Sequence, residues 1–151
     1  MSRLSRRFVI GGAAAAAALG GGIAVLSLRP APVDGLSPVA AHARSTAGTL
    51  WLIDIRRPDE WRATGIGAGA LPLDWRRPDF LDVLQSILAS APPRPVALIC
   101  ARGVRSARAS GRMAGTGLGR VLDVPEGMLG SRAGPGWIAR GLPVVRVRAR
   151  G

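Results

Sequence analysis

Short apolar runs alternate along the chain with segments of helical periodicity. TLWLIDI (49–55) and VALI (96–99) are too short for independent helices, which predicts two buried strands, and a third is predicted at 121–124. Apolar residues at three- and four-residue spacing predict an amphipathic helix that contains Phe80, Leu81, Leu84, Ile87 and Leu88. Helices are also expected at 38–47, after Pro58 and at 104–116, with a helical turn at 138–140 and an extended segment at 142–147. This alternation predicts an α/β fold with a central, mostly parallel sheet and helices on both faces.

Local signals mark where several of these helices begin. Ser37 can cap the first helix, with Pro38 at its first position. A similar eight-residue pattern then occurs twice, as DIRRPDEW (54–61) and DWRRPDFL (74–81). In each copy an extended segment ends before a proline, which favours a helix start. We interpret the repeat as the same local helix-start pattern occurring twice rather than as a functional repeat.

The first 32 residues differ in character from the rest. Three arginines precede an Ala/Gly-rich apolar run over residues 8–28, which is typical of an export signal. Within it, SRRFVI (5–10) resembles the twin-arginine signal. A run of this length can also span a bilayer, so cleavage and membrane tethering both stay open. We predict an export signal or anchor with a linker over 1–32, and one domain over 33–151 that is periplasmic or anchored to the inner membrane facing the periplasm.

The charge balance is strongly basic. The chain has 21 arginines, no lysine and 9 acidic residues, for a net charge of +12. The arginines are scattered without a long basic run, so we predict no nucleic-acid partner. The single cysteine excludes an internal disulfide. The sequence also lacks clustered Cys and His ligands and a phosphate-binding loop with lysine, so we predict neither a metal site nor a cofactor.

The only cysteine lies in CARGVRS (100–106), between a predicted strand and a predicted helix. In a parallel sheet with right-handed crossovers, this position is at the carboxyl edge, where active sites collect. Gly103 permits a tight turn whose N–H groups can face an anion. The helix N-terminus, Arg102 and Arg105 add positive charge. These surroundings favour a nucleophilic thiolate over an inert buried cysteine.

Three segments, in order, resemble signatures of the rhodanese-like family across residues 36–145: LIDIRRPDEW (52–61), ALICARGVRSARAS (97–110) and GWIARGLPV (136–144). The resemblance implies a three-layer α/β fold and sulfur transfer through a persulfide on Cys100. It implies that Arg105 and the loop amides bind the donor anion and stabilise the persulfide. The substrate-binding loop would then comprise Ala101, Arg102, Gly103, Val104 and Ser106.

The same resemblance suggests supporting residues. Asp54 and Arg56 would brace the site from the neighbouring strand end, with Glu60 as a partner of Arg56; a solvated salt-bridge set is the alternative interpretation of these three. Trp61 and Trp137 are expected in the core rather than at a ligand.

Two positions depart from the family pattern. GIGAGA (65–70) lacks the histidine that often follows the first signature, and His42, the only histidine, is expected to be structural or exposed. The position after the cysteine, which is often basic, is Ala101. A persulfide cycle without a general base requires a thiolate that is already ionised, and the donor preference stays open.

The sequence therefore predicts a sulfurtransferase that moves sulfane sulfur from a small anionic donor such as thiosulfate to cyanide or a thiol. One alternative is a non-catalytic binding module or redox partner protein of the same fold. Another is a cysteine phosphatase or arsenate reductase, which needs C-x5-R, whereas four residues separate Cys100 from Arg105 here. The physiological donor and acceptor and the oligomeric state are not determined by the sequence.

Overall fold

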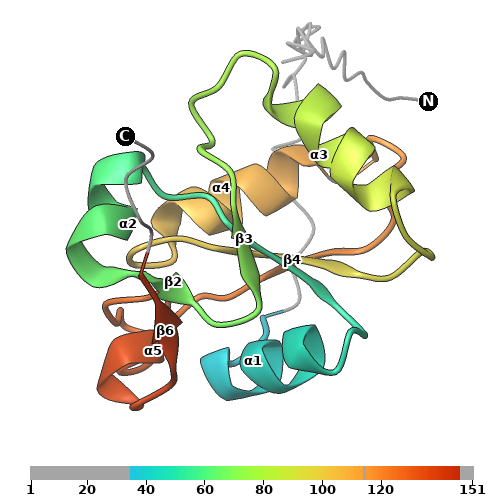
Figure 1. Ribbon diagram of the computed structural model, residues 1–151. Coiled ribbons are helices and arrows are strands. Elements are labelled where there is room, and N and C mark those ends of the chain that lie inside the picture. The colour runs from blue at the N-terminus through green and yellow to red at the C-terminus, as the bar shows by residue number, and fades with distance from the viewer. Residues whose placement is uncertain (1–34, 114, 147–151) are drawn as a thin grey trace, which may run out of the picture.

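A four-stranded parallel sheet forms the centre of the protein (Figure 1). The computed structural model describes residues 35–113 and 115–146. Across the sheet the strands are β3 (Ala70–Pro72), β1 (Trp51–Asp54), β4 (Val96–Ile99) and β5 (Val121–Asp123), with every neighbouring pair parallel. The three strands predicted from apolar runs are thus confirmed, and β4 is an interior strand.

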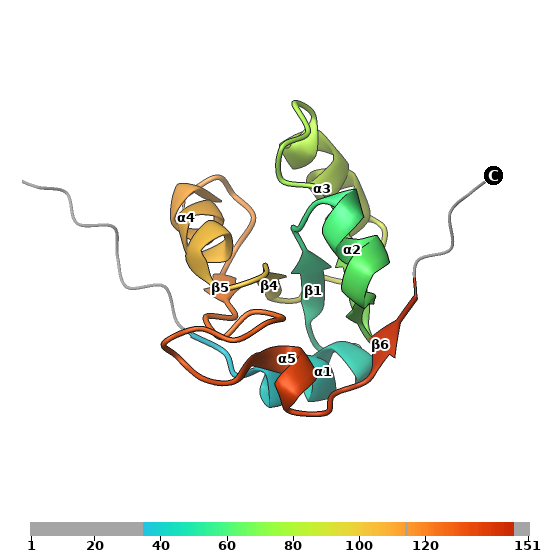
Figure 2. The ribbon, with the colours of Figure 1, turned by 90° about the vertical axis from the view of Figure 1, so that its left-hand side faces the viewer.

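Helices cover both faces of this sheet, as predicted. Figure 2 shows α3 (Phe80–Ala89) and α4 (Val104–Met113) on one face and α1 (Pro38–Thr46) and α5 (Gly136–Ala139) on the other. The remaining helix is α2 (Pro58–Thr64), which follows β1. None of the helices within 35–113 and 115–146 is long and apolar enough to cross a bilayer. The predicted signal or anchor over 1–32 lies outside the described residues.

The two faces carry separate hydrophobic clusters. Along β4 the side chains alternate, with Ala97 and Ile99 in one cluster and Val96, Leu98 and Cys100 in the other. The first cluster includes Trp137 of α5, and the second includes the buried apolar residues of α3 and α4. Burial on both faces explains why this strand is a continuous apolar run rather than an alternating one.

The helix starts largely follow the local signals. The Ser37 hydroxyl accepts a hydrogen bond from the Ala40 N–H at 3.2 Å, with Pro38 at the first helical position. In the first copy of the repeat, Pro58 begins α2. In the second copy, α3 begins only at Phe80, two residues after Pro78, because a turn with a Phe80 N–H to Arg77 C=O hydrogen bond comes first.

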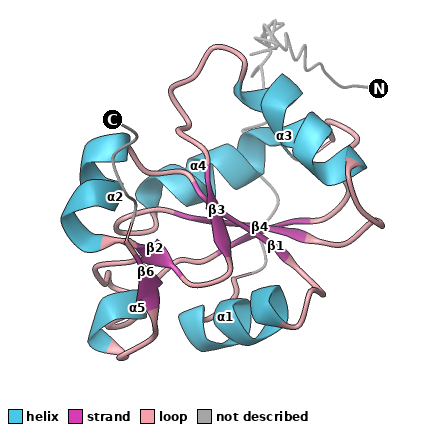
Figure 3. Ribbon diagram, in the orientation of Figure 1, coloured by secondary structure: helices cyan, strands magenta, loops and turns pink. Residues whose placement is uncertain are grey.

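Sequence analysis missed the structure of residues 65–72. This glycine-rich segment forms β2 (Ile66–Gly67) and the edge strand β3, which pairs with β1 through Leu52 and Ala70 (Figure 3). β2 pairs antiparallel with β6 (Val144–Val145), within the predicted C-terminal extended segment. The segment lacks an apolar run, so tertiary contacts define it: a side-chain carbon on Gly67 would lie 2.7 Å from the Trp137 ring.

Candidate active site

Cys100 lies directly after β4, at the carboxyl edge of the sheet between β1 and β5. The loop that follows it leads into α4 at Val104. The residue is only 1% exposed and packs in the cluster beneath α3 and α4. The predicted position of the cysteine is therefore confirmed, with the thiol at the floor of the loop rather than on the surface.

A second loop braces the cysteine loop from below. The Cys100 and Ala101 carbonyls accept hydrogen bonds from the N–H groups of Met128 and Leu129, both at 2.9 Å. Gly103 has φ +79°, and a side chain there would collide with the carbonyl oxygen of Pro125. Gly127 is equally constrained, since an added carbon would lie 2.5 Å from the Ala101 oxygen. The sequence predictions assigned this second loop no part in the site, although it follows β5, whose carboxyl end shares this edge of the sheet.

The loop leaves a run of backbone donors available. Within the described part of the chain, the N–H groups of residues 101–106 donate no hydrogen bond to a protein acceptor. The first backbone bond of the helix runs from the Ala107 N–H to the Gly103 carbonyl at 3.0 Å. These donors precede or begin the ten-residue α4. The positive end of the helix therefore coincides with unpaired amides, which is the arrangement that binds anions.

Ser106 places a hydroxyl against the sulfur. Its oxygen lies 3.4 Å from Cys100 Sγ and 3.1 Å from the Gly103 carbonyl oxygen, to which it donates a hydrogen bond. Ser106 is fully buried on the first turn of α4. A hydroxyl at this position can donate to an anionic sulfur as well as to the carbonyl.

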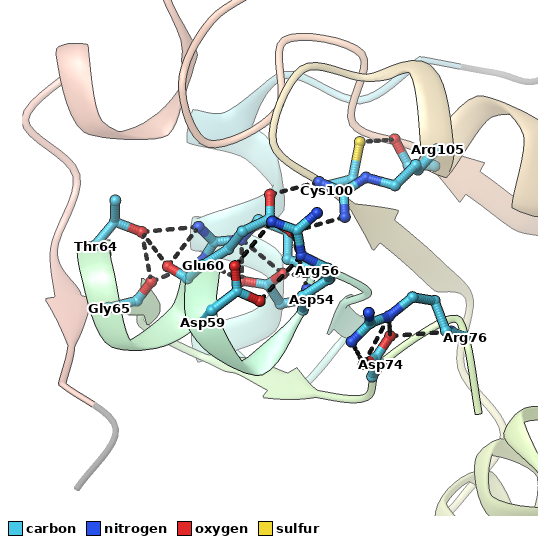
Figure 4. Close-up of polar contacts among 12 residues, drawn as sticks. Asp54, Arg56, Asp59, Glu60, Thr64, Gly65, Asp74, Arg76, Cys100 and Arg105 are labelled. Atoms are coloured by element: carbon cyan, nitrogen blue, oxygen red, sulfur yellow. Dashed lines mark hydrogen bonds and ion pairs between the residues drawn. The ribbon is translucent and has the colours of Figure 1, made fainter. Parts of the chain in front are cut away.

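Arg105 forms an ion pair across the site with Glu60 of α2 (Figure 4). Its two terminal nitrogens donate to the two Glu60 carboxylate oxygens at 2.8 and 2.6 Å. The hydrogen bond from Arg105 is the main reason that the pKa of Glu60 lies below its ordinary value. The prediction that the Glu60 side chain pairs with Arg56 is therefore wrong: only the Glu60 backbone carbonyl contacts Arg56, at 3.5 Å.

Asp54 and Arg56 form a buried ion pair at the end of β1. Arg56 donates from Nη2 and Nε to the Asp54 carboxylate at 2.7 to 3.0 Å, and both side chains are 1% exposed or less. Its other hydrogen bonds go to Thr64 Oγ1 at 2.8 Å and the Gly65 carbonyl at 2.7 Å. The solvated alternative is thus excluded for these two residues. They tie the end of β1 to the C-terminal end of α2, and α2 presents Glu60 to Arg105.

The remaining predicted residues are divided between the loop rim and the core. Arg102 and Val104 are exposed at the rim, where Val104 is 62% exposed. Trp61 and Trp137 are buried, as expected. His42 is structural: Nδ1 lies 3.1 Å from the Ala68 carbonyl oxygen, and its ring meets the Trp137 ring edge-on.

A groove of about 570 Å³ lies at the opposite end of the sheet. It is lined at the amino-terminal ends of the strands by residues such as Trp51, Pro95 and Leu118. The Arg94 guanidinium stacks over the Trp51 ring at 4.1 Å and donates to the Gly48 carbonyl. The groove is therefore remote from the thiol and takes no part in the cysteine site.

A model of the rhodanese-like domain family matches residues 37–131. The chain belongs to the rhodanese-like domain family. The match spans the first two signatures, the cysteine loop and the bracing loop through Ser131, and it agrees with the observed three-layer fold.

Several solved structures share this rhodanese fold. A possible tyrosine phosphatase from Rhodopseudomonas palustris is 24% identical, with a TM-score of 0.54 over 75% of this chain and 85% of the other. A polysulfide-sulfur transferase homodimer from Wolinella succinogenes is 24% identical, with a TM-score of 0.59 over 80% and 84%.

A thiosulfate sulfurtransferase from Pseudomonas aeruginosa is 22% identical, with a TM-score of 0.60 over 78% of this chain. The match spans only 21% of that longer protein. No curated protein sequence matches this chain. At these identities the structural likenesses establish the fold, and the chemistry must be argued from the site itself.

Proposed function

We propose that this rhodanese-family protein is a sulfurtransferase that carries sulfane sulfur as a persulfide on Cys100. The observation that carries the proposal is the position of the thiol, at the floor of a loop whose N–H groups at 101–106 have no acceptor in the described chain. A thiolate and a terminal persulfide sulfur are both anionic, and such donors stabilise them. Membership of the rhodanese-like family supports the same assignment.

The proposed reaction has two displacement steps. The Cys100 thiolate attacks the outer sulfur of thiosulfate, a new sulfur–sulfur bond forms, and sulfite leaves with the electron pair of the broken bond. Cyanide or an acceptor thiolate then attacks the terminal sulfur of the persulfide, which returns Cys100 as a thiolate. Each step conserves electrons overall, so no external oxidant or reductant is required.

The two loop arginines contribute differently in this scheme. The charge of Arg105 is largely balanced by Glu60, so it serves as a fixed donor beside the loop. Arg102 is exposed at the rim and has no ion-pair partner within the described residues. We therefore assign to Arg102 the first attraction of an anionic donor, and to the loop amides its final orientation.

A mass measurement tests the proposal directly. Incubation of the folded protein with thiosulfate should add the mass of one sulfur atom, and cyanide should remove it. Because the chain has a single cysteine, Cys100→Ser is a complete control and should gain nothing. No adduct on the folded native chain would instead support the non-catalytic binding module.

A second substrate separates sulfur transfer from phosphatase chemistry. The loop has one residue fewer between Cys100 and Arg105 than C-x5-R requires. We therefore expect hydrolysis of aryl phosphate to be negligible beside thiosulfate turnover. Comparable turnover of both substrates would overturn the sulfurtransferase assignment.

We also propose that residues 1–32 direct export through the twin-arginine route, which leaves the catalytic domain in the periplasm, either free or tethered through residues 8–28. Changing Arg6 and Arg7 to lysine preserves the positive charge but removes the pair. This double variant should stay in the cytoplasm in a fractionation blot. Unchanged export would mean that the arginines act only as charges.

A further inference from the structure

A buried carboxyl group lies beside the cysteine site without a role in the scheme above. Asp123, the last residue of β5, is 5% exposed, and its Oδ1 has no hydrogen-bond partner among the described residues. Buried carboxyl oxygens are rarely left unpaired, because their desolvation is costly. The unpaired Asp123 oxygen is therefore a candidate for a function beyond packing.

The sheet register places Asp123 on the same face as the cysteine. Asp123 pairs with Leu98 of the adjacent parallel strand β4. Leu98 and Cys100 belong to the cluster on the α4 side of the sheet, whereas Leu122 and Val124, the neighbours of Asp123, belong to the other. Since side chains alternate along a strand, the carboxyl group of Asp123 lies beneath α4, as does the Cys100 sulfur.

Ser106 connects the two groups. Its hydroxyl lies 3.4 Å from Cys100 Sγ. Burial raises the pKa of Asp123, and the nearby Ser106 side chain and Val124 N–H only partly oppose that rise. In the structure the Ser106 hydroxyl bonds the Gly103 carbonyl and the sulfur rather than the carboxyl group. One buried hydroxyl of α4 therefore contacts the sulfur and lies on the same face of the sheet as the carboxyl group.

No charged partner compensates Asp123 within the described chain. The arginines of α4 face elsewhere: Arg108 and Arg112 are exposed, and Arg105 is bonded to Glu60. From β4, Leu98 and Cys100 lie on its face of the sheet, and the buried residues of α4 are all neutral, namely Ser106, Ala109, Ser110 and Met113. Two negative charges on Asp123 and Cys100 would lie on one dry face, so the ionisations of the two groups oppose each other.

We infer that Asp123, Ser106 and Cys100 form a proton-linked relay, in which Asp123 is a positioning residue that controls the direction of the Ser106 hydroxyl. When protonated, Asp123 donates to the Ser106 oxygen, and the hydroxyl hydrogen is free to bond the anionic sulfur. When ionised, Asp123 accepts that hydrogen, and the sulfur loses a donor. That the relay also acts on a Cys100 persulfide rests on the proposed function. That it acts on the Cys100 thiolate does not.

The chain offers a clean optical test of this relay. It contains one cysteine and no tyrosine, so ultraviolet difference absorbance reports the Cys100 thiolate without interference from tyrosinate. Asp123→Asn keeps a donor for Ser106 and removes the charge. It should lower the midpoint of thiolate formation by about one pH unit, which is about tenfold more thiolate on the rising limb. Ser106→Ala should raise the midpoint, because the sulfur loses its hydroxyl donor.

The double variant distinguishes a relay from a simple charge effect. In the Ser106→Ala background, Asp123→Asn should shift the midpoint by less than half as much as it does in the native chain. Matched controls are Asp82→Asn, an exposed carboxylate on α3, and Ser110→Ala, whose hydroxyl bonds the Leu122 carbonyl one turn further along α4; neither should move the midpoint.

Two results would overturn the relay: a midpoint in Asp123→Asn equal to that of the native chain, or an equal shift with and without Ser106. If Asp123→Asn does not fold, Ser106→Ala alone decides, and an unchanged midpoint contradicts the proposal. The titration uses no sulfur donor. A protein that fails to form a persulfide can therefore still pass or fail this test independently.

Discussion

The carboxylate of Glu60 holds both terminal nitrogens of Arg105, at 2.8 and 2.6 Å, across 45 residues of sequence. The pair joins the first turn of α2 to the first turn of α4, beside the cysteine loop. Glu60 also accepts a hydrogen bond from the Arg57 N–H at 3.0 Å. The Arg105 guanidinium is therefore held by a residue of the first signature (52–61), although Arg105 itself belongs to the cysteine loop of the second (97–110).

Glu60→Gln tests what this ion pair does for the donor. The substitution keeps the shape of the side chain and frees the Arg105 charge, so we expect the KM for thiosulfate to fall severalfold. Because the pair is partly exposed, the free energy of unfolding should change by no more than about 1 kcal/mol. A higher KM would show instead that Glu60 is needed to position Arg105.

Arg105 itself should matter more. Arg105→Ala should slow transfer more than about tenfold, since a charge-assisted donor is lost beside the anion. Arg105→Lys separates point charge from planar geometry, because lysine cannot form the two-pronged bond to Glu60. Initial rates at saturating thiosulfate, with circular dichroism as a check on folding, provide the measurement. Full activity in Arg105→Ala would remove this residue from the site.

The two copies of the repeat provide a matched stability experiment. Arg56–Asp54 and Arg76–Asp74 have the same spacing and the same nitrogen–carboxylate bonds, but the Arg56 side chain is buried and the Arg76 side chain is 61% exposed. Arg56→Met leaves a buried carboxylate unpaired and should cost about 3–5 kcal/mol. Arg76→Met should cost less than about 1 kcal/mol. Urea denaturation measures the free energy of unfolding of both variants. Equal costs would contradict the argument that the buried pair matters more than the exposed one.

Two glycines with similar backbone angles test the bracing of the cysteine loop. Gly103 and Gly115 have φ of +79° and +90°, but only Gly103 has a backbone neighbour in the way of a side chain. Gly115→Ala should cost about 1–2 kcal/mol from the left-handed conformation alone. Gly103→Ala should cost more and should also prevent the sulfur adduct, because the loop must move away from Pro125. A native-like adduct yield in Gly103→Ala would contradict this account.

Stability should depend on pH with opposite sign at two carboxyl groups. The pKa of Glu60 is lowered in the folded state, so its contribution is present above the usual value of 4.5 and is lost as pH falls below it. The pKa of Asp123 is raised, so the folded state keeps that proton longer and loses stability as pH rises above the usual value of 3.8.

Unfolding at a series of pH values can separate the two groups. The stabilising effect of Asp123→Asn over the native chain should grow as pH rises from about 4 and then level off. The destabilising effect of Arg105→Ala should shrink as pH falls through the same region. Asp82→Asn, on the exposed face of α3, serves as the control for a general change in net charge.

The sequence by itself determined the parts of this protein that depend on local order. Apolar runs specified β1, β4 and β5, because a strand buried on both faces must be continuously apolar. Ser37 and Pro38 specified the start of α1 through a side-chain cap and a fixed backbone angle. The strand–loop–helix order around Cys100 placed the thiol at the carboxyl edge of the sheet, since parallel strands end at the same side.

Tertiary structure alone decided which distant groups meet. Nothing in the spacing of Glu60 distinguishes Arg56 from Arg105 as its partner; the positions that α2 and α4 take at the carboxyl edge of the sheet do. Strand β3 and the β2–β6 pair have no apolar run of their own and exist because neighbouring strands and Trp137 shape them. The contact of Ser106 with Cys100, and the burial of Asp123 beside them, depend on the register of β5 and on the fit of α4 against the sheet. Such contacts between remote segments arise from side-chain packing in three dimensions, which local sequence patterns do not encode.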